Sequence, residues 1–140
     1  FGSRDVKILA TDISPTILEK ARKATYAEGA LLDLPPTFMR KYFVKVGNEN
    51  PPIYQVSGDV KKMVRIARLN LLHPWPMKGP FDAIFCRNVM IYFDRQTQQK
   101  LVNRFWEMLD PGGYLFVGHS EGMSGAKHKF RYVRPATYVK

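Results

Sequence analysis

Four polar residues stand where this chain could carry out chemistry. Arg87 and Asn88 directly follow the apolar run Phe81–Cys86, Tyr92 comes four residues further on, and Asp12 follows an earlier apolar run. In an open α/β sheet, ligands bind beyond the carboxyl ends of the strands. These residues are therefore either polar strand ends or parts of one binding site.

Each of these residue types suits a particular ligand group. A carboxylate at the end of a strand can accept hydrogen bonds from both hydroxyls of a ribose, although Asp12 before Ser14-Pro15 equally suits a turn or a helix cap. A guanidinium binds a carboxylate with two hydrogen bonds, and a phenol can add one more. The alternative for Arg87 is an ion pair with an acid such as Asp82, and for Tyr92 it is packing.

Other residues that could suggest catalysis do not have the spacing for it. His119, Ser120 and Glu121 are adjacent, whereas the base and nucleophile of a catalytic triad must converge from separate positions. We interpret this block as a structural strand end. His73 and His128 have no metal-ligand spacing with Cys86, so the sequence predicts no metal site.

Turn residues separate the apolar runs into a series of short elements. The first half of the chain predicts a strand at Val6–Ala10, a helix capped by Ser14 with Pro15 next, and a short helix after Pro35. The second half predicts a strand at Phe81–Cys86, a helix from Arg95 to Leu109 capped by Asp94, and a turn at Asp110–Gly113. A strand at Tyr114–Val117 and an antiparallel pair at Phe130–Val133 and Thr137–Val139 follow. This alternation predicts an α/β fold with a mostly parallel sheet and helices on both faces.

The middle of the chain has a different character. Tyr42–Val46, Ile53–Val56 and Met63–Leu69 are short strand-like runs between turn residues. They predict a small antiparallel β-subdomain over residues 42–69, either a hairpin or a three-stranded unit, inserted into the main fold and standing off its core.

Length and composition narrow the function classes. The 140 residues suffice for one domain, and a net charge of +10 favours acidic partners. We expect no nucleic-acid partner, because the densest basic group (Lys61, Lys62, Arg65 and Arg68) has no interleaved aromatic residues.

No apolar run approaches the roughly 20 residues of a membrane span, so no membrane insertion is expected. A single cysteine fits a reducing compartment, and we expect the cytoplasm.

Two blocks of sequence carry a family resemblance. Residues 79–94, which contain Cys-Arg-Asn-Val-Met-Ile-Tyr-Phe-Asp, and residues 110–121, which end in Gly-His-Ser-Glu, resemble the C-terminal domain of CheR-type chemotaxis receptor methyltransferases. Ala-Thr-Asp-Ile-Ser at residues 10–14 matches the family upstream, and the resemblance runs from Lys7 to about Val139. It implies a Rossmann-like class I methyltransferase sheet with an inserted β-subdomain.

The resemblance also implies an activity and its partners. Members transfer a methyl group from S-adenosylmethionine to glutamate side chains of chemotaxis receptors, which gives glutamyl methyl esters and S-adenosylhomocysteine. The partner would be the cytoplasmic region of the receptors, whose acidic helices suit the basic charge of this chain.

Site residues follow from the same resemblance, position by position. Asp12 would bind the ribose, and Asn70 with Leu71 would flank the adenine. Arg87 and Asn88 would lie in the cofactor and acceptor region, and Tyr92 in the catalytic pocket. Arg87 and Tyr92 are thus the predicted catalytic residues.

Two parts of the family pattern are not found in these residues. The family's unit starts with a helical domain, followed by a central strand that ends in a loop containing Gly and Glu. We therefore expect an incomplete sheet, with the first strand absent, that is completed by a missing N-terminal segment or a partner chain, or that re-pairs its strands. These 140 residues alone would then bind cofactor weakly or not at all and be inactive. The alternative function is a noncatalytic regulatory or docking module that keeps the methyltransferase scaffold.

Overall fold

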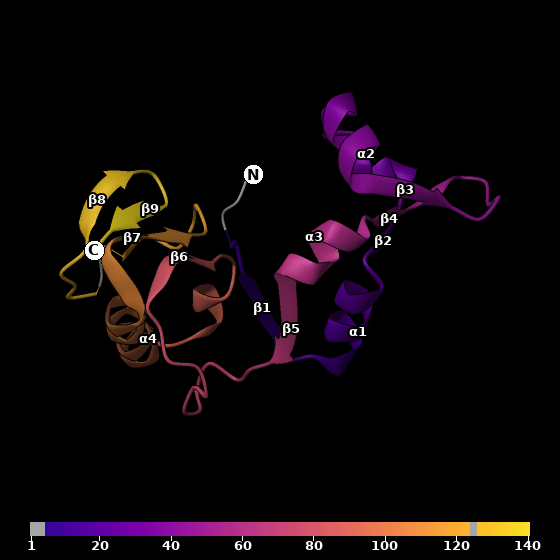
Figure 1. Ribbon diagram of the computed structural model, residues 1–140. Coiled ribbons are helices and arrows are strands. Elements are labelled where there is room, and N and C mark those ends of the chain that lie inside the picture. Colours follow the sequence, from indigo (N-terminus) through magenta and orange to yellow (C-terminus); the bar gives the residue numbers. More distant parts are fainter. Residues whose placement is uncertain (1–4, 124–125) are drawn as a thin grey trace. The chain divides into compact units, whose positions relative to one another are not determined.

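The computed structural model describes residues 5–123 and 126–140. The chain divides between Asn70 and Leu71 into two compact units, and each is described here by itself. Figure 1 labels the elements along the chain.

The first unit contains two small sheets with short helices. In chain order, its elements are β1 (Ile8–Asp12), α1 (Pro15–Lys23), β2 (Thr25–Ala27), the 3-10 helix η1 (Glu28–Leu31), α2 (Pro36–Tyr42), β3 (Phe43–Val46), β4 (Ile53–Val56), α3 (Gly58–Met63) and β5 (Val64–Arg68). β1 and β5 form a parallel pair, and β2, β4 and β3 form an antiparallel sheet in that order.

The predicted start of the first helix is confirmed. The Ser14 hydroxyl accepts a hydrogen bond from the backbone N–H of Ile17 at 3.4 Å, and Pro15 begins α1. Ser14 suits the cap because its hydroxyl supplies an acceptor for a backbone N–H of the first helical turn. Pro15 suits the next position because proline has no backbone N–H and so needs no acceptor. The preceding strand, β1, lies two residues later in the chain than predicted, at Ile8–Asp12 rather than Val6–Ala10. Asp12 is therefore the last residue of β1.

The predicted membership of the antiparallel subdomain was wrong in one strand. Val64–Arg68, within the predicted run Met63–Leu69, pairs with β1 in parallel rather than with the hairpin. The third strand of the antiparallel sheet is instead β2, which pairs with β4. The physical reason is that Thr25–Ala27 is too short and exposed to show a strand pattern, and that the partner of Val64–Arg68 depends on tertiary context and not on its local pattern.

The second unit contains one sheet and one long helix. In chain order, its elements are β6 (Phe81–Cys86), the 3-10 helix η2 (Met90–Tyr92), α4 (Arg95–Met108), β7 (Leu109–Val117), β8 (Arg131–Arg134) and β9 (Thr137–Val139). The strand order is β6-β7-β9-β8, and only β6 and β7 run parallel. The predicted strand at Phe81–Cys86 and the closing antiparallel pair are confirmed.

The long helix begins as the sequence predicts. A side-chain oxygen of Asp94 accepts a hydrogen bond from the N–H of Thr97 at 2.7 Å, and α4 starts at the next residue, Arg95. One side of α4 buries Leu101, Val102 and Phe105 in the core of this unit, and each is only 2% exposed. Leu115 and Val117 of β7 belong to the same cluster.

The predicted turn at Asp110–Gly113 forms inside β7. Phe81 of β6 pairs with Leu109, and Ala83 pairs with Tyr114, so residues 110–113 bulge out of the ladder. Gly112 has a φ of +82°, a left-handed conformation that glycine adopts without strain.

The strands of the described residues form three separate sheets. Within residues 5–123 and 126–140, β1 pairs only with β5, and β6 pairs only with β7 along its length. The parallel pairs therefore belong to separate sheets, and one edge of β1 and one edge of β6 have no strand partner in this part of the chain. The fold is mixed α/β.

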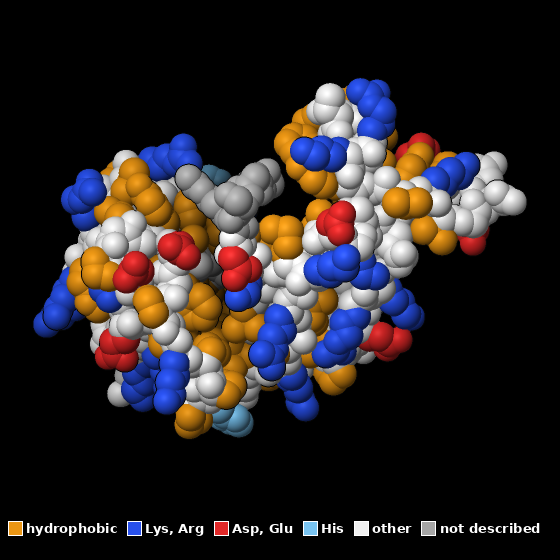
Figure 2. Space-filling view, viewed as in Figure 1, with side chains coloured by type: hydrophobic (Ala, Val, Ile, Leu, Met, Phe, Trp, Pro, Cys, Tyr) orange, Lys and Arg blue, Asp and Glu red, His pale blue; other side chains and the backbone are white. Residues whose placement is uncertain are grey.

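Charged side chains are dispersed over the visible face of the molecule (Figure 2). On the face that Figure 2 shows, lysine and arginine side chains lie at several separate places, with acidic side chains among them. No helix among the described residues combines the length and apolar character that a membrane span requires.

Candidate functional site at the strand ends

The first unit brings Asp12 and Asn70 to the same edge. β1 and β5 are parallel, and Asp12 is in register with Arg68, two residues before Asn70. One carboxylate oxygen of Asp12 (Oδ1) accepts the N–H of Ser14 at 2.7 Å. Asp12 is half-buried, and its other side-chain oxygen has no partner among the described residues. Asp12 therefore forms the turn that the sequence suggested and still has an acceptor for a ligand.

The second unit brings Arg87, Asn88 and Tyr92 to the carboxyl edge of its parallel pair. Cys86 at the end of β6 is in register with Val117 at the end of β7. Arg87 and Asn88 are exposed, and Tyr92 is 79% exposed. Among the described residues, no carboxylate lies within 4.0 Å of the Arg87 guanidinium, so the alternative ion pair with Asp82 is not formed.

Leu71, at the start of the second unit, is fixed by its backbone. Its carbonyl accepts hydrogen bonds from the indole N–H of Trp75 at 3.2 Å and from Arg104 at 3.0 Å. Its side chain packs partly against the core of the unit. Since the carbonyl has two donors already, a contact between Leu71 and an adenine would fall to its side chain or its N–H.

Glu121 joins the ends of β6 and β7. Its Oε2 atom accepts the N–H of Asn88 at 2.7 Å and that of Gly118 at 2.6 Å. Its Oε1 atom accepts the N–H of Val89 at 2.7 Å and that of Ile91 at 3.3 Å. The residue is only 5% exposed. One carboxylate therefore satisfies four backbone donors that would otherwise be unpaired.

These contacts change the acidity of the side chains involved. Burial by itself raises the pKa of Glu121, but the four backbone N–H groups outweigh it and hold the pKa below the ordinary 4.5. Burial, together with the negative charge of Glu121, raises the pKa of the Cys86 thiol to about 12. Cys86 is therefore a neutral core residue and not a nucleophile.

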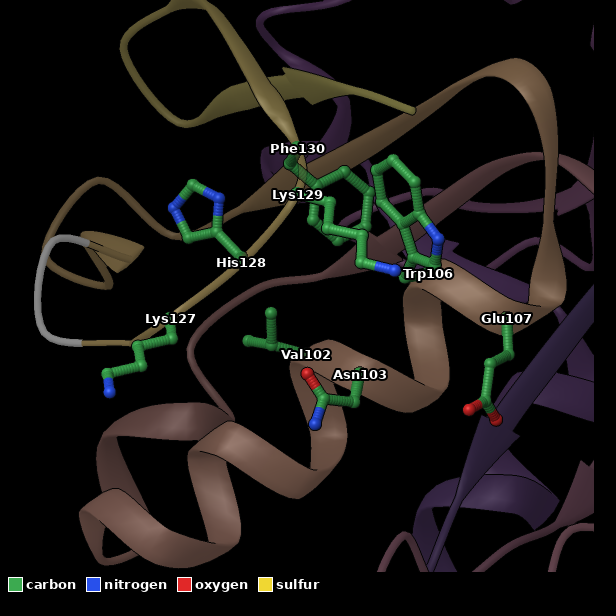
Figure 3. Close-up of a pocket in the computed structure, with 8 residues that line it drawn as sticks. All are labelled: Val102, Asn103, Trp106, Glu107, Lys127, His128, Lys129 and Phe130. Carbon is green, nitrogen blue, oxygen red and sulfur yellow. The ribbon is translucent and has the colours of Figure 1, made fainter.

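Two hollows occur in the second unit. One, of about 540 Å³, is lined by Met90, Ile91, Gln98 and Glu121, among others, and so adjoins the strand ends. The other, of about 450 Å³, lies between α4 and the segment Lys127–Phe130, as Figure 3 shows, and shares no lining residue with the first. The first is lined by Ile91, which precedes Tyr92 in the chain, and by none of the predicted site residues themselves. Within the part of the chain that the structure describes, no three His, Cys, Asp or Glu residues gather as metal ligands.

The sequence did not single out Glu121 or Gln98 as parts of the site. The available signal was an acid four residues after the end of β7, a strand parallel to the one that precedes Arg87. Three of its four hydrogen bonds join backbone N–H groups 30 or more residues away in the chain, which no local pattern displays.

The fold and the polar strand ends define an α/β protein of the kind that binds ligands beyond the carboxyl ends of parallel strands. Residues 2–139 match the family described as CheR methyltransferase, SAM-binding domain. This chain therefore belongs to the CheR methyltransferase family. The predicted resemblance and the S-adenosylmethionine cofactor are confirmed.

Individual relatives agree with this assignment. A Rhizobium etli protein named "probable chemotaxis protein methyltransferase" is 47% identical over 96% of this chain and 50% of its own length. Chemotaxis protein methyltransferases of Borreliella burgdorferi and Escherichia coli are 44% and 43% identical, over 96% and 89% of this chain and 47% and 44% of their own lengths. The chain thus spans about half the length of these relatives.

The buried carboxylate predicts a defined pH dependence of stability. Because its folded-state pKa is lowered, Glu121 contributes stability that is present above pH 4.5 and is lost as the pH falls through the folded-state value. At neutral pH we expect Glu121→Gln to reduce the free energy of unfolding by roughly 1–3 kcal/mol. This difference should shrink on acidification, because the Gln variant has no such group to protonate.

Urea unfolding at a series of pH values, followed by tryptophan fluorescence, measures this difference. Trp75 and Trp106 both lie in the second unit and are the chain's two tryptophans, so the signal reports on that unit. Stability curves for the wild type and Glu121→Gln that stay parallel down to about pH 3 would contradict the prediction.

Proposed function

We propose that this chain is the cofactor-binding part of an enzyme that methylates glutamate side chains of chemotaxis receptors. S-adenosylmethionine would be the donor, and glutamyl methyl esters with S-adenosylhomocysteine the products. The observation that carries the proposal is the pair Arg87 and Tyr92, both exposed on one loop at a strand end, in a chain of this family.

The polar groups of the predicted site residues fit the parts of the cofactor. Asp12 keeps one carboxylate oxygen for the ribose hydroxyls, and Asn70 at the same edge with Leu71 would flank the adenine. Arg87 and Asn88 would hold the cofactor near its reacting end. We propose that each of these residues contributes to cofactor binding, Asp12 and Asn70 from the first unit and Leu71, Arg87 and Asn88 from the second.

The reaction requires alignment of the methyl donor with the acceptor carboxylate more than it requires acid–base catalysis. S-adenosylmethionine supplies an electrophilic methyl group on a positively charged sulfur. A glutamate carboxylate oxygen would form the new bond to the methyl carbon while the carbon–sulfur bond breaks and the sulfur takes the electron pair. Arg87 would keep the acceptor carboxylate ionised and oriented with two hydrogen bonds, and Tyr92 would orient it with one.

Charge supports the choice of partner and compartment. The net charge of +10 and the exposed cations favour the acidic methylation helices of the receptors' cytoplasmic region. We accordingly propose that the protein acts in the cytoplasm.

The open strand edges support an incomplete class I methyltransferase sheet. In the described residues, one edge of β1 and one edge of β6 have no strand partner. We propose that an N-terminal segment or a partner chain, from outside these 140 residues, supplies the missing strand pairing. Unpaired backbone groups on such edges are otherwise a cost when they are buried.

The catalytic assignment predicts the effect of two substitutions. In the protein expressed from its complete reading frame, Arg87→Ala and Tyr92→Phe should each lower kcat for methyl transfer by roughly tenfold or more, since each removes a hydrogen bond that aligns the acceptor. The assay follows radiolabelled methyl transfer to a receptor cytoplasmic fragment. Arg131→Ala and Tyr132→Phe, exposed residues of β8, are matched controls and should retain the wild-type rate.

Wild-type rates in both Arg87→Ala and Tyr92→Phe would remove the site assignment. A complete protein that binds S-adenosylhomocysteine but transfers no methyl group would favour the noncatalytic docking module.

A second prediction concerns these 140 residues alone. Because the sheet edges are open, we expect the isolated chain to bind S-adenosylmethionine weakly or not at all and to be inactive. Titration calorimetry on a sample shown by circular dichroism to be folded measures the affinity. A dissociation constant of about 1–10 µM would contradict the proposed need for a further strand.

A further inference from the structure

The loop between Cys86 and Asp94 is held by side chains from two other elements. Glu121, beyond β7, accepts N–H groups from the first part of this loop, at distances given above. Gln98 of α4 donates its side-chain amide to the carbonyls of Met90 at 2.9 Å and Phe93 at 3.0 Å. Glu121 therefore accepts hydrogen bonds from backbone N–H groups of this loop, and Gln98 donates hydrogen bonds to its backbone carbonyls.

The conformation at the start of the loop depends on the carboxylate of Glu121. Asn88 has a φ of +58°, in the left-handed region that residues other than glycine rarely adopt. In this conformation the N–H groups of Asn88 and Val89 both point to the carboxylate of Glu121. Gly118 allows the close approach, because a Cβ there would touch Glu121 Oε2 and lie 2.7 Å from the side-chain oxygen of Asn88.

The side chain of Tyr92 has no anchor of its own. It is 79% exposed, and among the described residues neither its hydroxyl nor its ring has a hydrogen-bond or ring partner. Its backbone N–H donates to the carbonyl of Val89 at 3.2 Å. The place of the phenol is therefore set by the loop backbone, and the backbone is set by Glu121 and Gln98.

We propose that Glu121 and Gln98 are positioning residues for methyl transfer: they hold the loop that carries Arg87 and Tyr92 in its reactive geometry without touching either substrate. This inference rests on the proposed function. It assigns a role in the reaction to Glu121, which the sequence analysis interpreted as structural, and to Gln98, which it did not single out.

Substitutions of similar size separate this role from simple packing. Glu121→Gln keeps the volume but places an NH₂ group where one oxygen accepted N–H donors, so part of the set loses its acceptor. Gln98→Met keeps the length and loses both donated hydrogen bonds. Glu107→Gln and Gln96→Met, at exposed positions of α4, are the matched controls.

Hydrogen exchange reads out the loop directly, without reference to activity. In the protein from the complete reading frame, the amides of Asn88, Val89 and Gly118 should exchange slowly. In Glu121→Gln they should exchange about tenfold faster or more, since each has lost or weakened a bond to a charged acceptor. The controls should exchange as the wild type does.

Kinetics read out the consequence for the reaction. Glu121→Gln and Gln98→Met should lower kcat by roughly tenfold to a hundredfold, because a small displacement of aligned groups has an effect of that order. The dissociation constant of S-adenosylhomocysteine should change by less than about threefold in Gln98→Met, since that substitution acts on the Tyr92 end of the loop. A variant that was merely less stable would keep the kcat of its folded fraction.

The outcomes distinguish this inference from the proposed function. If Arg87→Ala and Tyr92→Phe are impaired while Glu121→Gln and Gln98→Met keep the wild-type kcat, only the positioning role is overturned. Unchanged exchange in Glu121→Gln also overturns it. If Arg87→Ala and Tyr92→Phe are themselves active, the proposed site fails, and the positioning role fails with it. Should Glu121→Gln not fold, Gln98→Met alone decides the kinetic test.

Discussion

A single buried carboxylate determines how the second unit presents its strand ends. The chain leaves β6 through Asn88 in a left-handed conformation, and the N–H groups of this turn point to Glu121, which is only 5% exposed. Buried backbone donors need acceptors, and Glu121 supplies both of its oxygens to four of them. Because Glu121 follows β7, the contact also joins the ends of two adjacent parallel strands.

The neighbouring elements follow from the same requirement. With the backbone donors directed at Glu121, the carbonyls of the following 3-10 turn face α4, where Gln98 donates to two of them. Asp94 then caps α4 immediately after this turn. The loop is left with its long side chains, those of Arg87 and Tyr92, in solvent. A rigid backbone with exposed functional groups is what an alignment-dependent reaction requires.

Local patterns were sufficient to predict the elements of the second unit. The strand Phe81–Cys86 and the cap at Asp94 were predicted because an apolar run and an Asp before a helical pattern have local physical causes. The third strand of the antiparallel sheet in the first unit was predicted wrongly, since the three exposed residues of β2 show no strand pattern and the partner of β5 has no local signal. The role of Glu121 could not be predicted, because its partners are backbone groups that carry no sequence signal. The exposed site residues were predicted from their places after strands, and their functional roles stay predictions.

The central claim is that polar residues at the strand ends bind S-adenosylmethionine, with Asp12 on the ribose. The most direct test is the dissociation constant of S-adenosylhomocysteine for the protein from its complete reading frame, with Asp12→Asn compared with Asp33→Asn, an exposed aspartate outside the site. Our account predicts that Asp12→Asn raises the dissociation constant by about tenfold or more, because a hydrogen bond to a charged group is lost. Asp33→Asn should leave it unchanged. An Asp12→Asn protein that binds as tightly as the wild type would contradict the account.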